Sequence, residues 1–138
     1  EKIRRTGKNN MEFSSDKVQV SKSPEELFAL FDNLENMKLF MPASVERFEA
    51  DENTFVFGLK GMPDVRLLVD EKTVPSMMKF KAASSKLDFT LACMIEANEG
   101  GSQVYYDFAG KFNPMIKMMV ERPLKKFIEE LAEATGKL

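Results

Sequence analysis

The feature that most constrains this chain is a series of segments in which apolar and polar residues alternate. The turns that join these segments are too short to hold a helix. The segments that we expect to be strands are residues 44–50, 54–60, 64–73, 77–82, 87–97 and 102–112. The turns between them are rich in glycine, proline and polar residues, as in Gly61-Met62-Pro63 and Asn98-Glu99-Gly100-Gly101. Parallel strands need crossover connections of about a dozen residues or more, so these strands must pair antiparallel, as a meander.

The apolar residues of these strands fall on one face of the predicted sheet. In the last two strands this face consists of Leu87, Phe89, Leu91, Cys93, Ile95, Val104, Tyr106, Phe108, Gly110 and Phe112. The residues between them, such as Asp88, Asp107 and Lys111, are expected to face water. An antiparallel sheet of this kind is solvated on one side and needs a cover on the other.

The C-terminal segment is predicted to be a helix that provides this cover. Asn113 can cap its start, Pro114 suits its first position, and Thr135-Gly136 indicates its end. The apolar stripe that we expect to face the sheet consists of Ile116, Met119, Val120, Phe127, Ile128 and Leu131. Pro123 lies inside this pattern and removes the hydrogen bond to the carbonyl of Met119, which predicts a kink or break there.

The segment before the meander is predicted to hold a strand over residues 12–20 and two short helices. Ser23-Pro24-Glu25-Glu26 forms a capping box that starts the first helix, and the second covers residues 34–40. Residues 1–10 are expected to be a flexible basic tail, and residues 11–138 a single domain. The predicted fold class is α+β, with a bent antiparallel sheet of about seven strands that grips one long helix across its concave face.

The composition excludes several kinds of chemistry. The 138 residues include no His and one Cys, so nucleophilic systems based on His, imidazole-bound metals and zinc sites built from several Cys are excluded. The formal net charge of -2 does not provide the basic surface that nucleic-acid binding needs. No run of about 18 apolar residues is present to span a membrane, and the N-terminal residues lack the apolar core of a signal peptide. A cytoplasmic location is therefore expected.

Several motifs together resemble one known group of proteins. They are Ser23-Pro24-Glu25-Glu26-Leu27-Phe28, Asp32-Asn33-Leu34-Glu35-Asn36, Met41-Pro42, and Asn113-Pro114-Met115-Ile116-Lys117-Met118-Met119 running to Arg122-Pro123-Leu124. With the order of elements, they resemble small bacterial members of the START-like superfamily, also called the polyketide cyclase/dehydrase and lipid transport, SRPBCC or Bet v 1-like group. The resemblance implies a helix-grip fold with an apolar cavity between sheet and long helix for lipids, sterols or polyketides. It also implies that some members are enzymes and that others bind partner proteins.

The residues that we expect to line such a cavity are aromatic, aliphatic and Met side chains on the inward faces and at the cavity mouth. They are Phe31, Met37, Phe57, Leu67, Phe80, Phe89, Leu91, Tyr106, Phe108, Met115, Met118 and Met119. The alternative is that they form a plain core, since aromatic residues at strand spacing usually do. Tyr106 is the most informative of them, because a buried phenol needs a ligand, a water or a protein group as its hydrogen-bond partner.

Candidates for acid–base chemistry are few. Glu71 is in phase with Val65 and Leu67 and could point inward, but a solvated position near the strand end is the simpler interpretation. Cys93 is expected to be a small buried hydrophobe, because no cation is placed to lower its pKa. We predict no catalytic residue, no metal and no cofactor.

Three functions remain open from the sequence. The first is binding or transport of a small hydrophobic ligand in an internal cavity, gated by residues 33–43 and by the kink at Pro123. The second is a partner-binding module of the co-chaperone or ubiquinone-associated type, which an exposed apolar patch near Val56 or Leu68 would favour. The third is a polyketide cyclase or dehydratase, which would need an acid or base beside Tyr106.

Overall fold

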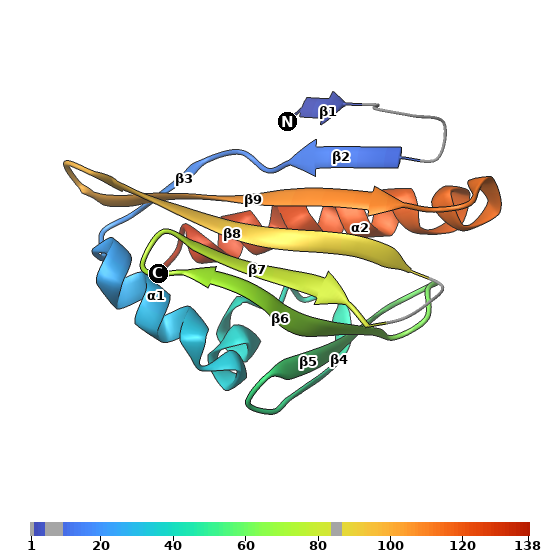
Figure 1. Ribbon diagram of the computed structural model, residues 1–138, viewed down its shortest axis with the longest axis horizontal. Coiled ribbons are helices and arrows are strands. Elements are labelled where there is room, and N and C mark those ends of the chain that lie inside the picture. Colours follow the sequence, from blue (N-terminus) through green and yellow to red (C-terminus); the bar gives the residue numbers. More distant parts are fainter. Residues whose placement is uncertain (1, 5–9, 84–86) are drawn as a thin grey trace.

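The computed structural model describes residues 2–4, 10–83 and 87–138, and within them nine strands form one antiparallel sheet. The strands are β1 (Lys2–Arg4), β2 (Asn10–Ser14), β3 (Val18–Val20), β4 (Val45–Ala50), β5 (Thr54–Leu59), β6 (Val65–Thr73), β7 (Met77–Ala82), β8 (Asp88–Asn98) and β9 (Gly101–Lys111). Their order is β1-β2-β9-β8-β7-β6-β5-β4, with β3 also paired to β9 (Figure 1). Strands β4 to β9 form the predicted meander, with ends within one residue of those expected.

The longest hairpin, β8–β9, shows how the sequence determines the register. Its strands pair from Asp88 with Lys111 to Asn98 with Gly101, so the apolar residues of both strands face the same side. Gly101 has φ of 128°, in the region that favours glycine. A Cβ there would also lie 2.5 Å from the carbonyl oxygen of Val20. This turn therefore requires glycine for two independent reasons.

The two short helices lie between β3 and β4 and begin with the predicted caps. Helix α1 (Pro24–Asp32) starts with a complete capping box, because the Glu26 amide donates to Ser23 Oγ and the Ser23 amide donates to Glu26 Oε1. The 3₁₀ helix η1 (Leu34–Phe40) follows, and Asn33 Oδ1 accepts from the amide of Glu35 at its start. Both helices bury apolar residues against the sheet.

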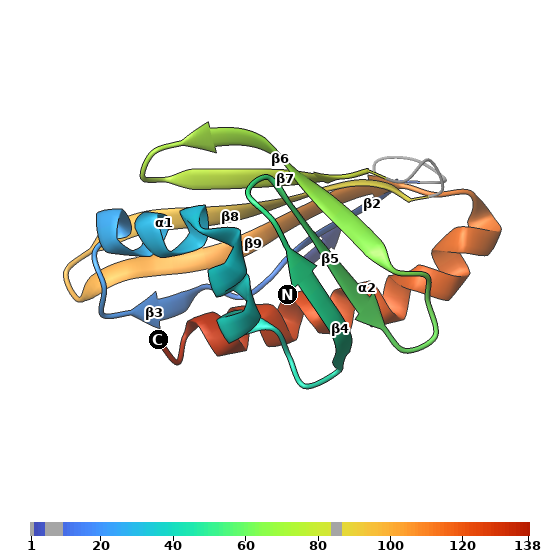
Figure 2. The ribbon, with the colours of Figure 1, turned by 90° about the horizontal axis from the view of Figure 1, so that it is seen from below.

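The long helix α2 (Pro114–Thr135) lies across the concave side of the bent sheet, which curves around it from β2 to β4 (Figures 1 and 2). Asn113 Oδ1 caps it by accepting from the amide of Ile116 at 2.9 Å. Pro123 lies inside the helix, which continues through it but changes direction along its length in Figure 2. The face that packs inward is formed by Val120, Leu124, Phe127, Ile128, Leu131, Ala132 and Thr135.

Two details differ from the sequence prediction. The strand expected over residues 12–20 is split into β2 and β3, both paired to β9, because Ser15 turns inward and its Oγ accepts from the Tyr106 amide. Lys2–Arg4 forms β1 against β2, where a flexible tail was expected; residues 1 and 5–9 of that tail lie outside the described residues. Gly136 caps the end of α2 where the sequence indicates it, in a right-handed conformation with φ of -65°.

Candidate ligand-binding site

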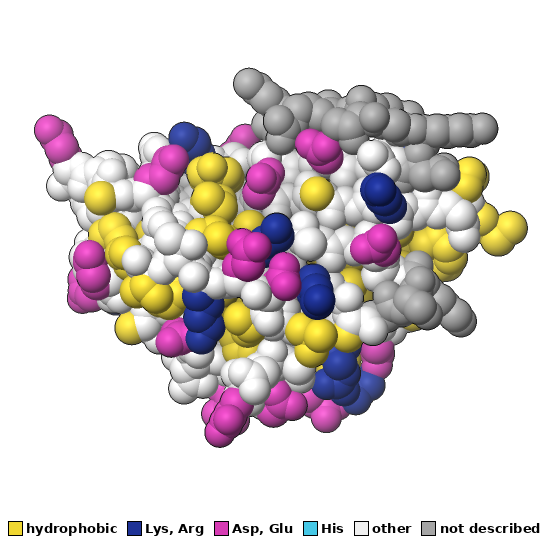
Figure 3. Space-filling model, in the orientation of Figure 1, with side chains coloured by type: hydrophobic (Ala, Val, Ile, Leu, Met, Phe, Trp, Pro, Cys, Tyr) yellow, Lys and Arg dark blue, Asp and Glu magenta, His cyan; other side chains and the backbone are white. Residues whose placement is uncertain are grey.

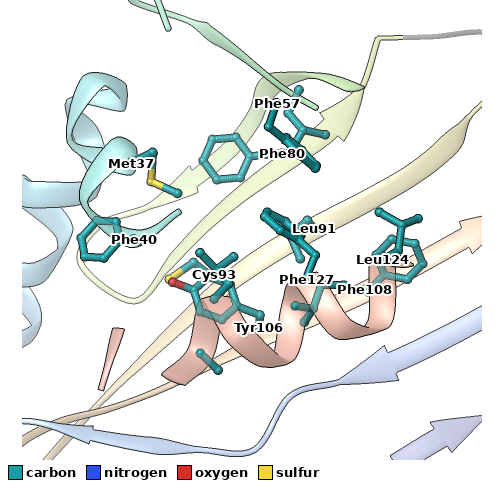
Figure 4. Close-up of a cluster of buried hydrophobic side chains, with 14 of the residues drawn as sticks. Met37, Phe40, Phe57, Phe80, Leu91, Cys93, Tyr106, Phe108, Leu124 and Phe127 are labelled. Carbon is teal, nitrogen blue, oxygen red and sulfur yellow. The ribbon is translucent and has the colours of Figure 1, made fainter. Parts of the chain in front are cut away.

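Most of the residues predicted to line a cavity lie together between the sheet and the helices. Those that are at most 4% exposed are Phe31, Met37, Phe57, Leu67, Phe80, Phe89, Leu91, Tyr106 and Phe108. Figure 4 shows side chains from η1, from several strands and from α2 converging on this one interior. The topology therefore brings together residues that are as much as 77 positions apart in the sequence (Phe31 to Phe108).

Aromatic rings fill much of this interior by direct contact. Phe57 of β5 stacks on Phe127 of α2 with ring centroids 4.5 Å apart and an interplanar angle of 11°. Phe89 and Phe108 pack at 5.0 Å across the β8–β9 hairpin. Burial and ring packing of this kind occur both in a plain core and around a closed cavity, so a role in ligand binding for these side chains stays a prediction.

The methionines at the start of α2 lie elsewhere. Met115 is 80% exposed, Met118 is 85% exposed and Met119 is 40% exposed, so all three lie on the outer side of the helix. The expected position of Met119 on the core-facing stripe is therefore wrong. Val120 and Leu124, spaced by one helical turn, occupy the inward face, and Met119 is rotated away from it.

A polar cluster lies within the apolar interior at Tyr106. Its hydroxyl is 2.7 Å from Thr135 Oγ1, and the Thr135 hydroxyl donates to the Leu131 carbonyl at 2.9 Å. The Cys93 side chain lies beside the same phenol (Figure 4). Burial raises the pKa of the Cys93 thiol to about 12 and raises the pKa of Tyr106 well above its usual range, so both are neutral near pH 7.

Thr135 was missed in the sequence because it stands at the helix end, where a polar residue is usually solvated. Two features of the sequence could have revealed Thr135. It follows Leu131 of the inward stripe by one helical turn, and a buried Tyr106 needs a hydrogen-bond partner. Glu71, the candidate acid, is exposed. The solvated interpretation of Glu71 is therefore confirmed.

A surface pocket of about 440 Å³ opens where the β4–β5 hairpin meets α2. Its lining consists of Ala43, Ser44, Glu46, Leu59, Lys60, Arg122, Pro123 and Lys126. Leu59 and Pro123 supply apolar surface, while Lys60, Arg122 and Lys126 place three cations around it against one carboxylate. Ser44 Oγ donates to Glu130 Oε1 at 3.0 Å and joins the loop before β4 to α2 beside the pocket. Sequence reasoning missed this pocket because three separate segments form it.

Leu59 connects this pocket to the interior. Its side chain is 6% exposed and belongs to the same buried cluster as Phe57 and Phe127. Lys126, on the pocket wall, directly precedes Phe127 in α2. The cation-lined pocket and the apolar interior are thus adjacent along both β5 and α2.

No protein-family model and no curated protein matches this sequence. Solved structures do match it. A norcoclaurine synthase mutant from Thalictrum flavum, bound to a transition-state analogue, superposes with a TM-score of 0.69 at 11% identity, covering 96% of each chain. The KanY protein superposes with a TM-score of 0.72 at 14% identity, covering 91% of this chain and 96% of its own. A protein from Thermus thermophilus gives 0.65 at 17% identity, covering 93% and 94%. The chain has the Bet v 1-like fold.

The Bet v 1-like fold supports several functions, so the function must be argued from the site. Of the two positions where an exposed apolar patch would favour a partner-binding module, Val56 is only 7% exposed and Leu68 is half-buried. Within the described residues, the exposed large hydrophobic side chains are Leu39, Val74, Met115, Met118 and Met119. No helix in the described part of the chain has the length and apolar composition needed to cross a lipid bilayer.

Proposed function

We propose that this protein binds a small hydrophobic molecule carrying an anionic group, which enters at the pocket beside Pro123. The observation that carries the proposal is the adjacency of a pocket lined by Lys60, Arg122 and Lys126 to the apolar interior behind Leu59. Burial of an apolar ligand contributes about 0.8 kcal/mol per methylene group removed from water. The cations would hold an acidic group at the entrance and so orient the ligand.

The superfamily that has this fold binds hydrophobic ligands, which supports the proposal. Entry into the interior requires Phe57 and Phe127 to separate, because their rings are stacked. Pro123 has no amide hydrogen, so the carbonyl of Met119 lacks its helical partner and α2 bends most easily there. The Ser44–Glu130 hydrogen bond is the contact that would open when the loop before β4 moves away from α2.

A cyclase or dehydratase is less well supported by the site. Such chemistry needs a carboxylate or another base beside Tyr106. Tyr106 instead contacts Thr135 and Cys93, and the pKa of Cys93 is raised, which keeps the thiol protonated. Within the described residues, the buried polar or charged side chains are Ser15, Ser102 and Thr135.

The test is native mass spectrometry combined with titration calorimetry, using dodecanoic acid and dodecanol as probes. We expect both probes to bind, the acid more tightly. The double variant Arg122→Gln/Lys126→Gln should reduce the affinity for the acid about tenfold and leave the affinity for the alcohol unchanged. The matched control is Lys38→Gln/Lys81→Gln, two exposed lysines on other elements, which should change neither. Failure of both probes to bind, or an equal loss for acid and alcohol, would contradict the proposal.

A further inference from the structure

An exposed apolar cluster lies on the first turns of α2 and plays no part in the binding site described above. Met115 and Met118 are the most exposed large hydrophobic side chains of the described residues, and Met119 lies next to them. Their spacing of three and four residues places them on one side of the helix. Exposed apolar side chains that cluster on a surface are a feature of interaction sites.

The cluster is carried on a convex end of the molecule. The first turns of α2 form one extremity of the fold in both ribbon views, and apolar side chains gather at that end of the surface (Figures 1, 2 and 3). Asn113 and Pro114, which precede the cluster, are exposed as well. A projecting apolar tip is shaped for insertion into a soft, flat layer, whereas a protein partner would need a matching groove.

Charge is divided along α2 in a way that favours an anionic partner at this end. Residues 114–126 carry Lys117, Arg122, Lys125 and Lys126 against the single acid Glu121. Residues 127–138 carry Glu129, Glu130 and Glu133 against Lys137. The chain as a whole has a net charge of -2, so the basic character belongs to the methionine-bearing half of the helix and not to the protein generally.

The methionine cluster also leads to the ligand pocket. Arg122 follows Met118 and Met119 by four and three residues, and Lys126 follows Arg122 by four, so these residues continue along the same outer side of the helix. Both cations line the pocket. A binding partner whose surface contacts Met115 and Met118 would therefore lie close to the entrance of the ligand pocket.

From these observations we infer that the N-terminal half of α2 docks on an anionic phospholipid bilayer, with Met115, Met118 and Met119 inserted among the lipids and the cations at the headgroups. Flexible, unbranched Met side chains adapt to a fluid layer. The residues that dominate the binding energy of protein–protein interfaces are, by contrast, enriched in Trp, Tyr and Arg and lie in enclosed pockets. Apolar insertion with flanking cations is the combination that holds helices at membrane interfaces. Met115, Met118 and Met119 do not line the pocket, so the apolar part of this docking surface is available whether or not a ligand is bound.

The experiment is flotation of the ligand-free full chain with phosphatidylcholine vesicles, with and without phosphatidylglycerol. We expect binding at least about tenfold tighter when the anionic lipid is present, since each Lys or Arg near such a surface contributes about fivefold, and we expect high salt to weaken it. Met115→Ser/Met118→Ser should weaken binding by about tenfold or more. The control Leu39→Ser/Val74→Ser removes two side chains that are 67% and 69% exposed elsewhere, and should have no effect.

The inference would be overturned by no binding to anionic vesicles, by equal binding to both kinds of vesicle, or by equal loss in the methionine and control variants. A dimer in solution that Met115→Ser/Met118→Ser converts to a monomer would show that a second copy covers the cluster, and would overturn it too. Circular dichroism of each variant establishes that it is folded. Since no ligand is present, failure here leaves the dodecanoic acid experiment and the proposed function unaffected.

Discussion

The hydroxyl of Tyr106 donates a hydrogen bond to that of Thr135 across 2.7 Å and so joins the middle of β9 to the last turn of α2. The direction follows from the Thr135 hydroxyl, whose hydrogen is already donated to the Leu131 carbonyl at 2.9 Å. Both side chains are at most 1% exposed. The long helix is therefore fixed to the sheet at its C-terminal end by a buried polar contact, and by apolar packing elsewhere.

Substitutions at this contact should have unequal effects. Thr135→Val removes the acceptor of the phenol's hydrogen bond and should lower the free energy of unfolding by about 1–3 kcal/mol. Tyr106→Phe removes the buried hydroxyl itself and should cost about 1 kcal/mol. Urea denaturation of both single variants and the double variant measures these values. If the double variant loses the sum of the two single losses, the two hydroxyls are not coupled as the structure indicates.

Stability should fall in alkaline solution because of Cys93. Burial raises the pKa of this thiol from an ordinary value of 9.0 to about 12. Between these values the unfolded chain loses the proton and the folded chain keeps it, so the stabilisation is complete below pH 9 and is lost as the pH rises toward 12. The expected slope reaches about 1.4 kcal/mol per pH unit.

Urea denaturation at pH 8, 9 and 10 measures that slope. Cys93→Ala should show a shallower decline over this range, although its stability at pH 8 is lower because of the lost packing. Tyr106, whose pKa is also raised, contributes to the decline mainly at the alkaline end. An equal slope in the wild type and in Cys93→Ala would show that the thiol is not the group that titrates.

The strands were predictable because alternation and turn residues are local signals. The meander ends at Lys111, one residue before its predicted end, and the capped starts of α1 and α2 lie at Pro24 and Pro114, as the sequence indicates. Ser15, which breaks the first strand in two, was not predictable in this way. Its inward turn depends on the Tyr106 amide, a partner 91 residues away.

The candidate site was predictable in part. Inward strand residues such as Phe57 and Phe89 lie where period-two alternation places them. Helical residues are harder to assign, because a stripe that includes Met119 differs from one that includes Leu124 by a modest rotation about the axis. The pocket at Pro123 forms where three separate segments of the chain meet. A contact between distant segments produces no local sequence pattern, so the pocket could not be predicted.

Gly110 should resist substitution because of its neighbours. A Cβ there would lie 2.9 Å from both the Phe112 ring and the Phe89 Cβ, and the latter cannot move without the backbone. Gly110→Ala should therefore lower the free energy of unfolding by about 1–3 kcal/mol. Gly100→Ala is the matched control, since its Cβ would meet the mobile amide end of Gln19 at 2.9 Å. Thermal denaturation compares the two, and a similar loss in both would contradict the packing argument.

Replacement of Pro123 should make α2 less flexible and the protein more stable. Pro123→Ala restores the amide that can donate to the Met119 carbonyl, and it should raise the free energy of unfolding by as much as about 3 kcal/mol. The stiffer helix should also slow the uptake of dodecanoic acid, measured by stopped-flow displacement of a fluorescent fatty acid. Pro114→Ala is the control, because proline is already favourable at the first helical position and neither quantity should change. If Pro123→Ala is more stable but takes up the acid as fast as the wild type, α2 does not bend there during entry.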